Sequence, residues 1–509
     1  MFFNSFPFIF IFLPISIIIY FTLVKRHGLF GQIWLAIVSL IFYGLLTPEY
    51  LPLLLASIVF NYSIGSIIIK SLNDSALEKW IKPTLIIGVL GDVLLLGYYK
   101  YFNFVIFNLD RIPGLNIPML EIIMPLGISF FTFTQLAYLA DAYSGKVKST
   151  TFISYLQFVT FFPHLIAGPI YHHSEIIPQF EDKNGYVVNW GNINLGILFF
   201  FFGLAKKVVI ADNLALVATP IFSAVSNGGN PMFFEAWLGA LAYTLQLYFD
   251  FSGYSDMAIG IALMFNIHFP LNFFSPYKVT SIIDFWRCWH ITLSNWLRDY
   301  LYIPLGGNRY GIPIQMRNIL ITMLIGGLWH GAGWTFVIWG GLHGLFLVIN
   351  HLWRMTGRKV HNFIGWLVTF IAVVIGWVFF RADSVHSALV ILKRMVGGYG
   401  VSIPSILPNF GYFVQKGLIS VAPLDGVLAF SSVIIGLFLV LCLPNLAELT
   451  KNFNGPMIHP KQDTLILFRI IHVPIVYSPS YGWSFFSAIV AVCAIIALQT
   501  TSEFLYFQF

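Results

Sequence analysis

Long apolar runs separated by short polar turns dominate the chain. The first three runs cover residues 6–24, 29–46 and 51–69, and a helix needs about 20 apolar residues to cross a bilayer. Further runs lie at 84–102, 122–143, 152–170, 195–210, 237–265, 319–349, 364–380, 426–443, 465–476 and 485–498. The pattern predicts an all-α polytopic membrane protein with about 11 to 13 membrane helices.

Glycine and proline interrupt several of these runs. The segments FPHLIAGPIYHH, residues 162–173, and MPLGISFF, residues 124–131, both break an apolar pattern. Broken backbone at membrane depth is tolerated only where protein buries it or where it lines a wet cavity. We therefore expect some helices to be re-entrant or interfacial, arranged around a central funnel or tunnel.

The chain offers no soluble linker and no internal repeat. Residues 1–509 are therefore expected to form a single membrane-embedded domain, with a motif-bearing core at about 120–381 and C-terminal helices at about 382–509. The lack of a repeat weakens a transporter built from inverted halves. A transporter whose polar groups conduct a substrate, and a scaffold without chemistry of its own, stay open as alternatives.

Composition agrees with a membrane protein. Only 9% of the residues are charged and 58% are hydrophobic, whereas a soluble domain has roughly 25% charged residues. The net charge of +6 fits basic residues in cytoplasmic loops, and no basic run is long enough for a nucleic-acid patch. The basic cluster at 25–27 predicts a cytoplasmic end for the first helix, with the N-terminus outside.

Two polar tracts stand out within this apolar chain. Residues 281–309 contain His290, and residues 326–340 contain His330. An ionisable group at membrane depth is costly and is therefore a functional-site hypothesis. If residues 284–300 form one helix, a cationic and hydroxyl stripe follows one face of it. The members of that stripe are Arg287, His290, Ser294 and Arg298.

Structural interpretations compete with each of these sites. The 284–300 helix is also compatible with a surface helix that touches lipid headgroups, and His330 with a core histidine bonded to a carbonyl. No spacing favours a metal site, and the three distant cysteines favour neither zinc nor a disulfide framework. Charge pairing that orients helices is the favoured interpretation of two further tracts. These are residues 206–213 and residues 248–260, which include Asp250 and Tyr254.

Together these tracts resemble the membrane-bound O-acyltransferase (MBOAT) superfamily, and in particular its bacterial branch typified by alginate O-acetyltransferase. The matching residues are FPHLIAGPI, KKVVIADNLA, LGALAYTLQLYFDFSGYSDMAIG, DFWRCWHITLSNWLRDYLYIPLGGNR and GGLWHGAGWTFVIWG. The resemblance extends to about residue 381. Two departures are Cys288 and residues 171–173, because arginine is common at both places in such proteins.

The resemblance implies an MBOAT-like fold and an O-acyltransferase with His330 as the catalytic histidine and His290 as the second active-site histidine. It implies an acetyl-thioester donor, most simply acetyl-CoA on the cytoplasmic side, and no bound cofactor. The acetyl group would cross a bacterial inner membrane to an extracytoplasmic partner enzyme that modifies an exported polysaccharide. Alginate, cellulose and peptidoglycan all remain open as that polysaccharide.

The donor and the remaining site residues are less closely defined. A related reading is transfer of D-alanine from a carrier protein to teichoic acid. Arg287, Ser294, Arg298, Asp250 and Tyr254 are the candidate residues for substrate or donor binding. Lys278, Arg309 and Arg317 join the two arginines as candidates for holding donor phosphates, because guanidinium and ammonium groups bind phosphate oxygens well.

Overall fold

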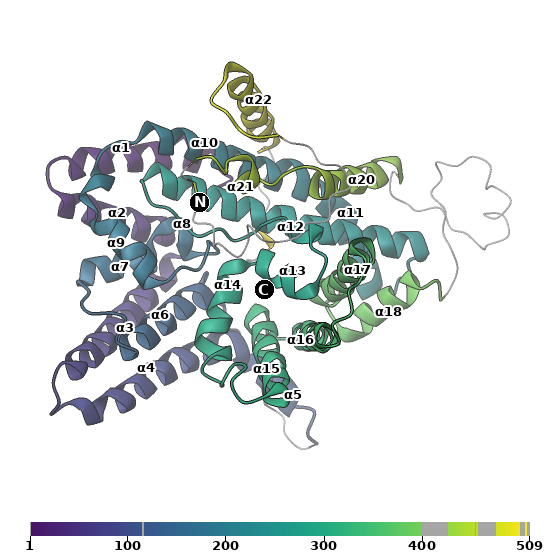
Figure 1. Ribbon diagram of the computed structural model, residues 1–509, viewed down its shortest axis with the longest axis horizontal. Helices are drawn as coiled ribbons and strands as arrows, with labels where there is room; N and C mark the ends of the chain where they lie inside the picture. Colours follow the sequence, from purple (N-terminus) through teal and green to yellow (C-terminus); the bar gives the residue numbers. More distant parts are fainter. Residues whose placement is uncertain are drawn as a thin grey trace.

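The chain folds into packed helices, with no strand among the residues that the structure describes (Figure 1). The computed structural model describes residues 2–113, 117–398, 426–453, 455–456, 475–498 and 504–505. Most of the predicted run 465–476 lies outside the described residues.

The helices of the first half are η1 (Phe8–Phe12), α1 (Leu13–Val24), α2 (Gly28–Gly44), η2 (Pro48–Tyr50), α3 (Leu51–Leu72), η3 (Glu78–Trp80), α4 (Ile81–Leu96), η4 (Gly97–Tyr101), α5 (Phe102–Leu109), α6 (Ile128–Tyr143), α7 (Phe152–Thr160), α8 (Phe162–Leu165), α9 (His173–Glu181), η5 (Lys183–Tyr186), α10 (Trp190–Ala205), η6 (Lys206–Ala211) and α11 (Asp212–Ser226). Those of the second half are α12 (Phe233–Met264), η7 (Pro276–Lys278), α13 (Ile282–Cys288), α14 (Ile291–Leu297), η8 (Arg298–Tyr302), α15 (Ile312–His330), α16 (Trp334–Met355), α17 (Asn362–Arg381), α18 (Val385–Met395), α20 (Gly426–Cys442), α21 (Leu446–Leu449) and α22 (Tyr481–Ala497).

Six helical segments of the described chain are long and apolar enough to cross a membrane. They are Pro48–Leu72, Glu78–Leu109, Trp190–Ser226, Ile312–His330, Trp334–Met355 and Asn362–Arg381. Shorter apolar helices lie at Phe8–Val24, Gly28–Gly44, Val427–Cys442 and Tyr481–Ala497. The prediction of an all-α polytopic membrane protein is confirmed.

The long helix α12 lies at the centre of the fold, between α10, α11, α17 and α20 (Figure 1). Glycine lets its backbone approach α10 directly. A Cβ atom added to Gly203 would lie 2.5 Å from the carbonyl oxygen of Gly253, and one added to Gly253 would lie 2.7 Å from that of Gly203. Small residues permit such close packing between membrane helices, where van der Waals contact replaces the hydrophobic drive.

Buried ion pairs join the same helices near the middle of α12. The Lys207 ammonium lies 2.7 Å from Asp250 and 2.9 Å from Asp212, and the Lys206 ammonium lies 2.5 Å from Asp256. Each lysine stands in the π-helical turn η6, between α10 and α11. Charge pairing of these two tracts was predicted from the sequence and is confirmed.

The single helix predicted over residues 284–300 is wrong. Helix α13 ends at Cys288, α14 begins at Ile291, and His290 between them has φ 42° and ψ 54°. A left-handed residue cannot continue a right-handed helix, so the cationic stripe does not form. The break turns His290 away from the helical register that would have placed it beside Arg287 and Arg298.

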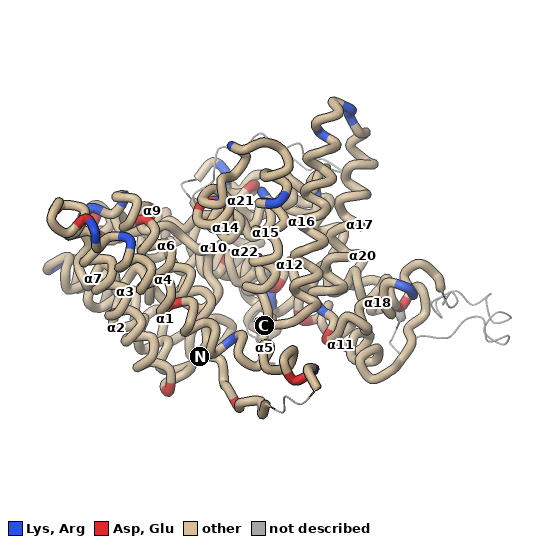
Figure 2. The backbone as a smooth tube through the Cα atoms, turned by 90° about the horizontal axis from the view of Figure 1, so that it is seen from below, with Lys and Arg blue, Asp and Glu red and all other residues tan. Residues whose placement is uncertain are grey.

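Basic residues mark one edge of the molecule. Lys70, Lys79 and Lys82 lie at the α3–α4 turn, and Arg354, Arg358 and Lys359 lie at the junction of α16 and α17. Figure 2 shows the basic positions of the α16–α17 junction at the upper edge of that view. Under the positive-inside rule this distribution indicates the cytoplasmic edge.

The α10–α12 contact gives the first testable prediction. We expect Gly203→Val to lower stability by about 1–3 kcal/mol or more, because the new side chain must displace backbone rather than a flexible side chain. The measurement is the Tm of the purified protein in detergent. Gly482→Ala is the matched control, since an added Cβ there meets nothing within 4 Å. Equal Tm values for the two variants would contradict the assigned packing.

Candidate active site

His290 occupies a strained position in the break between α13 and α14. It is one of three non-glycine residues with positive φ in the described chain. A left-handed conformation costs an ordinary residue of order 1–3 kcal/mol and persists where its surroundings fix it. Here the backbone N–H of Ile291 donates to the carbonyl of Asn272 at 3.0 Å, which holds the break against the loop after α12.

The Asn272 side chain determines which nitrogen of His290 carries the proton. Its oxygen Oδ1 accepts from the hydroxyl of Thr292 at 3.0 Å and from the Thr292 backbone N–H at 3.4 Å, while its Nδ2 donates to Ser255 at 3.1 Å. A backbone N–H can only donate, so the atom facing it is an oxygen. His290 Nδ1, 3.1 Å from the same oxygen, is therefore the protonated nitrogen, and Nε2 of a neutral ring holds a lone pair.

His330 is the last residue of α15, directly before the turn that leads into α16. The two helices pack closely because Gly327 and Gly340 face each other, and a Cβ on Gly327 would lie 3.1 Å from the Cα of Gly340. The backbone of Gly331 donates to the carbonyl of Gly327 at 3.4 Å as the helix ends. The predicted role of glycine, a break with close backbone approach, is present at this point.

The two histidines lie near each other inside the protein. Their ring centroids are 6.3 Å apart, and the exposed fractions of His290 and His330 are 0% and 5%. Aromatic rings surround them: Trp339 and Phe380 lie 5.0 and 5.2 Å from His330, and Phe251 lies 4.7 Å from His290. Two tracts that are separate in sequence thus meet among buried aromatic rings.

A third buried histidine lies beyond this pair. The ring of His343 of α16 lies 4.9 Å from that of Trp339, which also lies 5.0 Å from His330. Trp286 and Trp377 complete the aromatic surroundings of His343, at 5.2 and 6.0 Å. No group of three potential metal ligands occurs in the described part of the chain.

A small cavity adjoins His330. Its volume is about 50 Å³, and its lining includes Lys100, Ser129, Phe130, Ile166, Trp329 and His330. A water molecule occupies roughly 30 Å³ in the liquid, so the cavity has room for one or two waters or for a group such as a hydroxymethyl. Lys100 was not among the predicted site residues, although a single lysine within the apolar run 84–102 was a visible signal.

Arg287 and Arg298 both already have carboxylate partners. Arg287 lies 2.9 Å from Asp284, and the Arg298 guanidinium binds both oxygens of Asp299, at 2.7 and 2.8 Å. About half of each arginine side chain is exposed. A phosphate group would have to compete with these carboxylates. The Ser294 hydroxyl donates to the Trp289 carbonyl at 3.4 Å, within the same broken segment.

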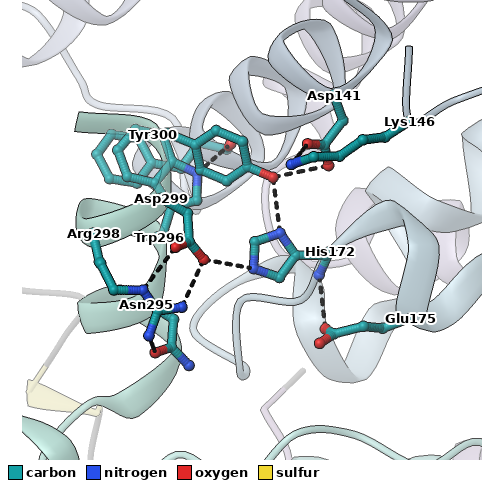
Figure 3. A network of polar contacts seen from close by, with 10 residues as sticks. Asp141, Lys146, His172, Glu175, Asn295, Trp296, Arg298, Asp299 and Tyr300 are labelled. Carbon is teal, nitrogen blue, oxygen red and sulfur yellow. Dashed lines mark hydrogen bonds and ion pairs between the residues drawn. The ribbon is translucent and has the colours of Figure 1, made fainter. Parts of the chain in front are cut away.

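Asp299 and its neighbours connect the start of α9 to the end of α6 (Figure 3). The Tyr300 hydroxyl donates to Asp141 at 2.9 Å and lies 2.8 Å from His172 Nδ1, while His172 Nε2 is 3.9 Å from Asp299. Burial, and then the Asp141 charge, raise the pKa of Tyr300 above its usual value, which keeps the phenol protonated as a donor. The segment 171–173, one of the two departures from the family pattern, thus contributes His172 to this network.

Asp250 and Tyr254 of α12 both pack against other parts of the chain. Asp250 forms the buried pair with Lys207 and also accepts from the backbone N–H of Leu505 at 3.1 Å. The ring of Tyr254 stacks on Phe3 at 5.0 Å and meets the edge of Phe504 at 4.6 Å. Residues near both ends of the chain therefore cover this part of α12, and a binding role for these two residues stays a prediction.

The apolar helices and the buried histidine pair together define the class, an integral membrane protein with two histidines in its interior. Comparison with known proteins identifies its family. The profile of the membrane-bound O-acyltransferase (MBOAT) family matches residues 83–388, and the chain belongs to this family. It is an O-acyltransferase, as the sequence predicted. Both histidines and the cavity residue Lys100 lie within the matched range.

Similar proteins carry related activities in their names. The peptidoglycan O-acetyltransferase of Helicobacter pylori is 45% identical over 445 residues, which cover 81% of this chain and 83% of that protein. The probable alginate O-acetylase AlgI of Pseudomonas aeruginosa is 44% identical over 395 residues, 76% of this chain and 73% of the other. The teichoic acid D-alanyltransferase of Streptococcus thermophilus is 27% identical over 251 residues, 47% of this chain and 59% of the other.

The orientation of His290 by Asn272 can be tested by removing the amide. We expect Asn272→Ala to lower acyl transfer roughly 10- to 100-fold at equal folded protein, because the imidazole loses its fixed tautomer and direction. Asn272→Asp keeps an acceptor for Nδ1 and should retain more activity than Asn272→Ala. The measurement is label transfer from acetyl-CoA in membranes, normalised to protein level. Equal activity of both variants and wild type would count against this orientation.

Proposed function

We propose that this protein moves an acetyl group from a cytoplasmic thioester, most simply acetyl-CoA, to a hydroxyl destined for an exported polysaccharide. The observation that carries this proposal is the close approach of His290 and His330 in the buried interior, with ring centroids 6.3 Å apart. Acyl transfer needs a base with a pKa near neutral, and histidine is the side chain that meets this requirement most simply.

In this mechanism His330 acts as the general base. It removes the proton from the acceptor hydroxyl while the oxygen attacks the thioester carbonyl, and the C–S bond then breaks to release the thiol of the donor. A covalent acetyl-histidine is the variant in which His330 itself attacks the carbonyl.

His290 is assigned an orienting role. Its Nδ1–H is engaged with Asn272, so Nε2 of the neutral ring accepts a hydrogen bond rather than donating one. This bonding argues against donation from His290 to the thioester carbonyl, since donation from Nε2 would require a charged imidazolium in apolar surroundings. The hydroxyl that His330 deprotonates has a single proton, so Nε2 of His290 would accept from another N–H or O–H group of the acceptor.

The acceptor is proposed from the similar proteins. Two of them carry peptidoglycan and alginate in their names, which supports an exported glycan as the final acceptor. We further propose that an extracytoplasmic partner enzyme receives the acetyl group and that the protein resides in a bacterial inner membrane. The D-alanyl alternative rests on a more distant similarity over less than half of the chain.

The first experiment compares acetyl transfer by wild type, His330→Ala and His290→Ala. Labelled acetyl-CoA is supplied to native membranes, and label in the glycan fraction is measured at matched levels of folded protein. We expect His330→Ala to lose at least roughly 100-fold, the low end of what a positioned acid–base group contributes, and His290→Ala to lose less. His386→Ala, on the exposed face of α18, is the matched control and should equal wild type.

Retained transfer by His330→Ala would contradict the assigned base. If wild type itself transfers no label, acetyl-CoA is not the donor, and a carrier-protein thioester or the scaffold reading takes its place. If wild type does transfer label, digestion of the glycan fraction distinguishes peptidoglycan from alginate as the labelled polymer.

Donor binding by Arg298 gives a separate prediction. If Arg298 exchanges its Asp299 contacts for a donor phosphate, Arg298→Gln should raise the KM for acetyl-CoA roughly tenfold, the value of one charge-assisted hydrogen bond, and leave kcat near wild type. The measurement is initial rate against acetyl-CoA concentration. Arg358→Gln, exposed after α16, serves as the control. A loss that saturating donor does not restore would argue against this binding role.

A further inference from the structure

The end of α15 lies inside the protein, where its last carbonyl groups are bonded by other parts of the chain. Helix α15 ends at His330, which is only 5% exposed. The last four carbonyl groups of an α-helix have no partner within the helix, and a buried carbonyl without a partner is costly. The hydrogen bonds that replace those partners also fix the position of His330.

A single turn of another helix supplies most of these bonds. The Tyr101 hydroxyl donates to the carbonyl of Leu328 at 2.7 Å. The Lys100 ammonium donates to the carbonyl of Trp329 at 2.6 Å and to that of His330 at 3.2 Å. Three consecutive carbonyls at the end of α15 are thereby bonded by two consecutive residues. We call Lys100 and Tyr101 the α15 cap.

The cap depends on an irregular turn. Lys100 and Tyr101 belong to η4 (Gly97–Tyr101), a π-helical turn between α4 and α5. The wider turn of a π-helix brings consecutive side chains closer in direction than an α-helix does, and such turns are frequent at functional sites. The regular α-helical run predicted over 84–102 would have spread the two side chains further apart.

The Lys100 ammonium satisfies all of its donors without a carboxylate. Its third contact is the Ser129 hydroxyl of α6, at 3.1 Å. Within the described residues no carboxylate oxygen lies within 4.0 Å of this nitrogen, whereas Lys206 and Lys207 pair with aspartates and Lys278 lies 4.0 Å from Glu448. The partial negative charge at the C-terminal end of α15 takes the place of a counter-ion.

We propose that Lys100 is a positioning residue for the acyl transfer, and that with Tyr101 it fixes the backbone of His330 at the wall of the 50 Å³ cavity. This inference rests on the proposed role of His330. Lys100 contacts the peptide groups on both sides of the His330 Cα through one ammonium group. A shift of about 1 Å in a base costs roughly 100-fold in rate, so loss of the cap is expected to act on kcat.

The test compares five full-length variants in native membranes with labelled acetyl-CoA, measuring kcat and the KM for acetyl-CoA at matched folded protein. Lys100→Met keeps the length of the side chain and removes the charge, and kcat should fall at least tenfold, toward roughly 100-fold, with KM little changed. Lys100→Arg keeps the charge and the donors and should recover part of the loss. Tyr101→Phe removes one carbonyl bond and should lower kcat less than Lys100→Met.

Two controls separate the possible failures. Tyr98→Phe changes a hydroxyl in the same turn on a side chain that is 48% exposed, and should equal wild type. His330→Ala tests the proposed base itself: retained transfer there overturns the proposed function, whatever Lys100 does. Lost transfer in His330→Ala together with a wild-type kcat in Lys100→Met overturns only the positioning role.

A purely structural role for Lys100 would appear differently. Lys100→Met would then lower Tm and the amount of folded protein but leave kcat per folded molecule unchanged, and Lys100→Arg would restore yield without changing kcat. If Lys100→Met does not accumulate, Tyr101→Phe decides the question: a kcat equal to that of Tyr98→Phe overturns the inference, and a lower kcat at normal KM supports it.

Discussion

The active site depends on the rule that backbone polar groups inside a membrane protein must find partners within the protein. Helix α15, one of the segments long enough to cross a membrane, ends at His330, which the protein buries almost completely. The exposed peptide groups at such an end are costly, so the surrounding helices must be arranged to bond them. The π-helical turn η4, the glycine contact with α16 and the start of α6 all meet at this helix end.

The same rule explains the second histidine. The chain breaks between α13 and α14 at His290, and the freed groups there turn to Asn272, which bonds the Ile291 backbone and the Thr292 side chain. The backbone carbonyl of Asn272 thus stabilises the break, and its side-chain oxygen sets the histidine tautomer. Each of the two histidines therefore lies where a helix is interrupted, and in each case the group that repairs the interruption also orients the ring or its backbone.

Much of the fold was predictable because it follows from hydrophobic length and pattern. The all-α membrane architecture and the pairing of Lys206 and Lys207 with aspartates could be derived from residue types and spacing. The roles of the two histidine tracts stay predictions. The break at His290 could not be derived in this way, because a period of 3.6 residues assumes a continuous helix and the segment 284–300 has no glycine or proline to mark a stop. Tertiary bonds to Asn272 decided that conformation instead.

The cap on α15 escaped sequence reasoning for a related reason. Lys100 and the carbonyl of His330 are 230 residues apart, and no local pattern links a lysine on one helix to the end of another. The sequence does show that such a partner is needed. Burying a lysine in an apolar run costs free energy, and a lysine without an acidic neighbour must find some other negative partner. The carbonyl groups of Trp329 and His330 at the end of α15 provide that partner. The lysine and the helix end therefore satisfy each other: the carbonyls replace a carboxylate for the ammonium, and the ammonium replaces the next helical turn for the carbonyls.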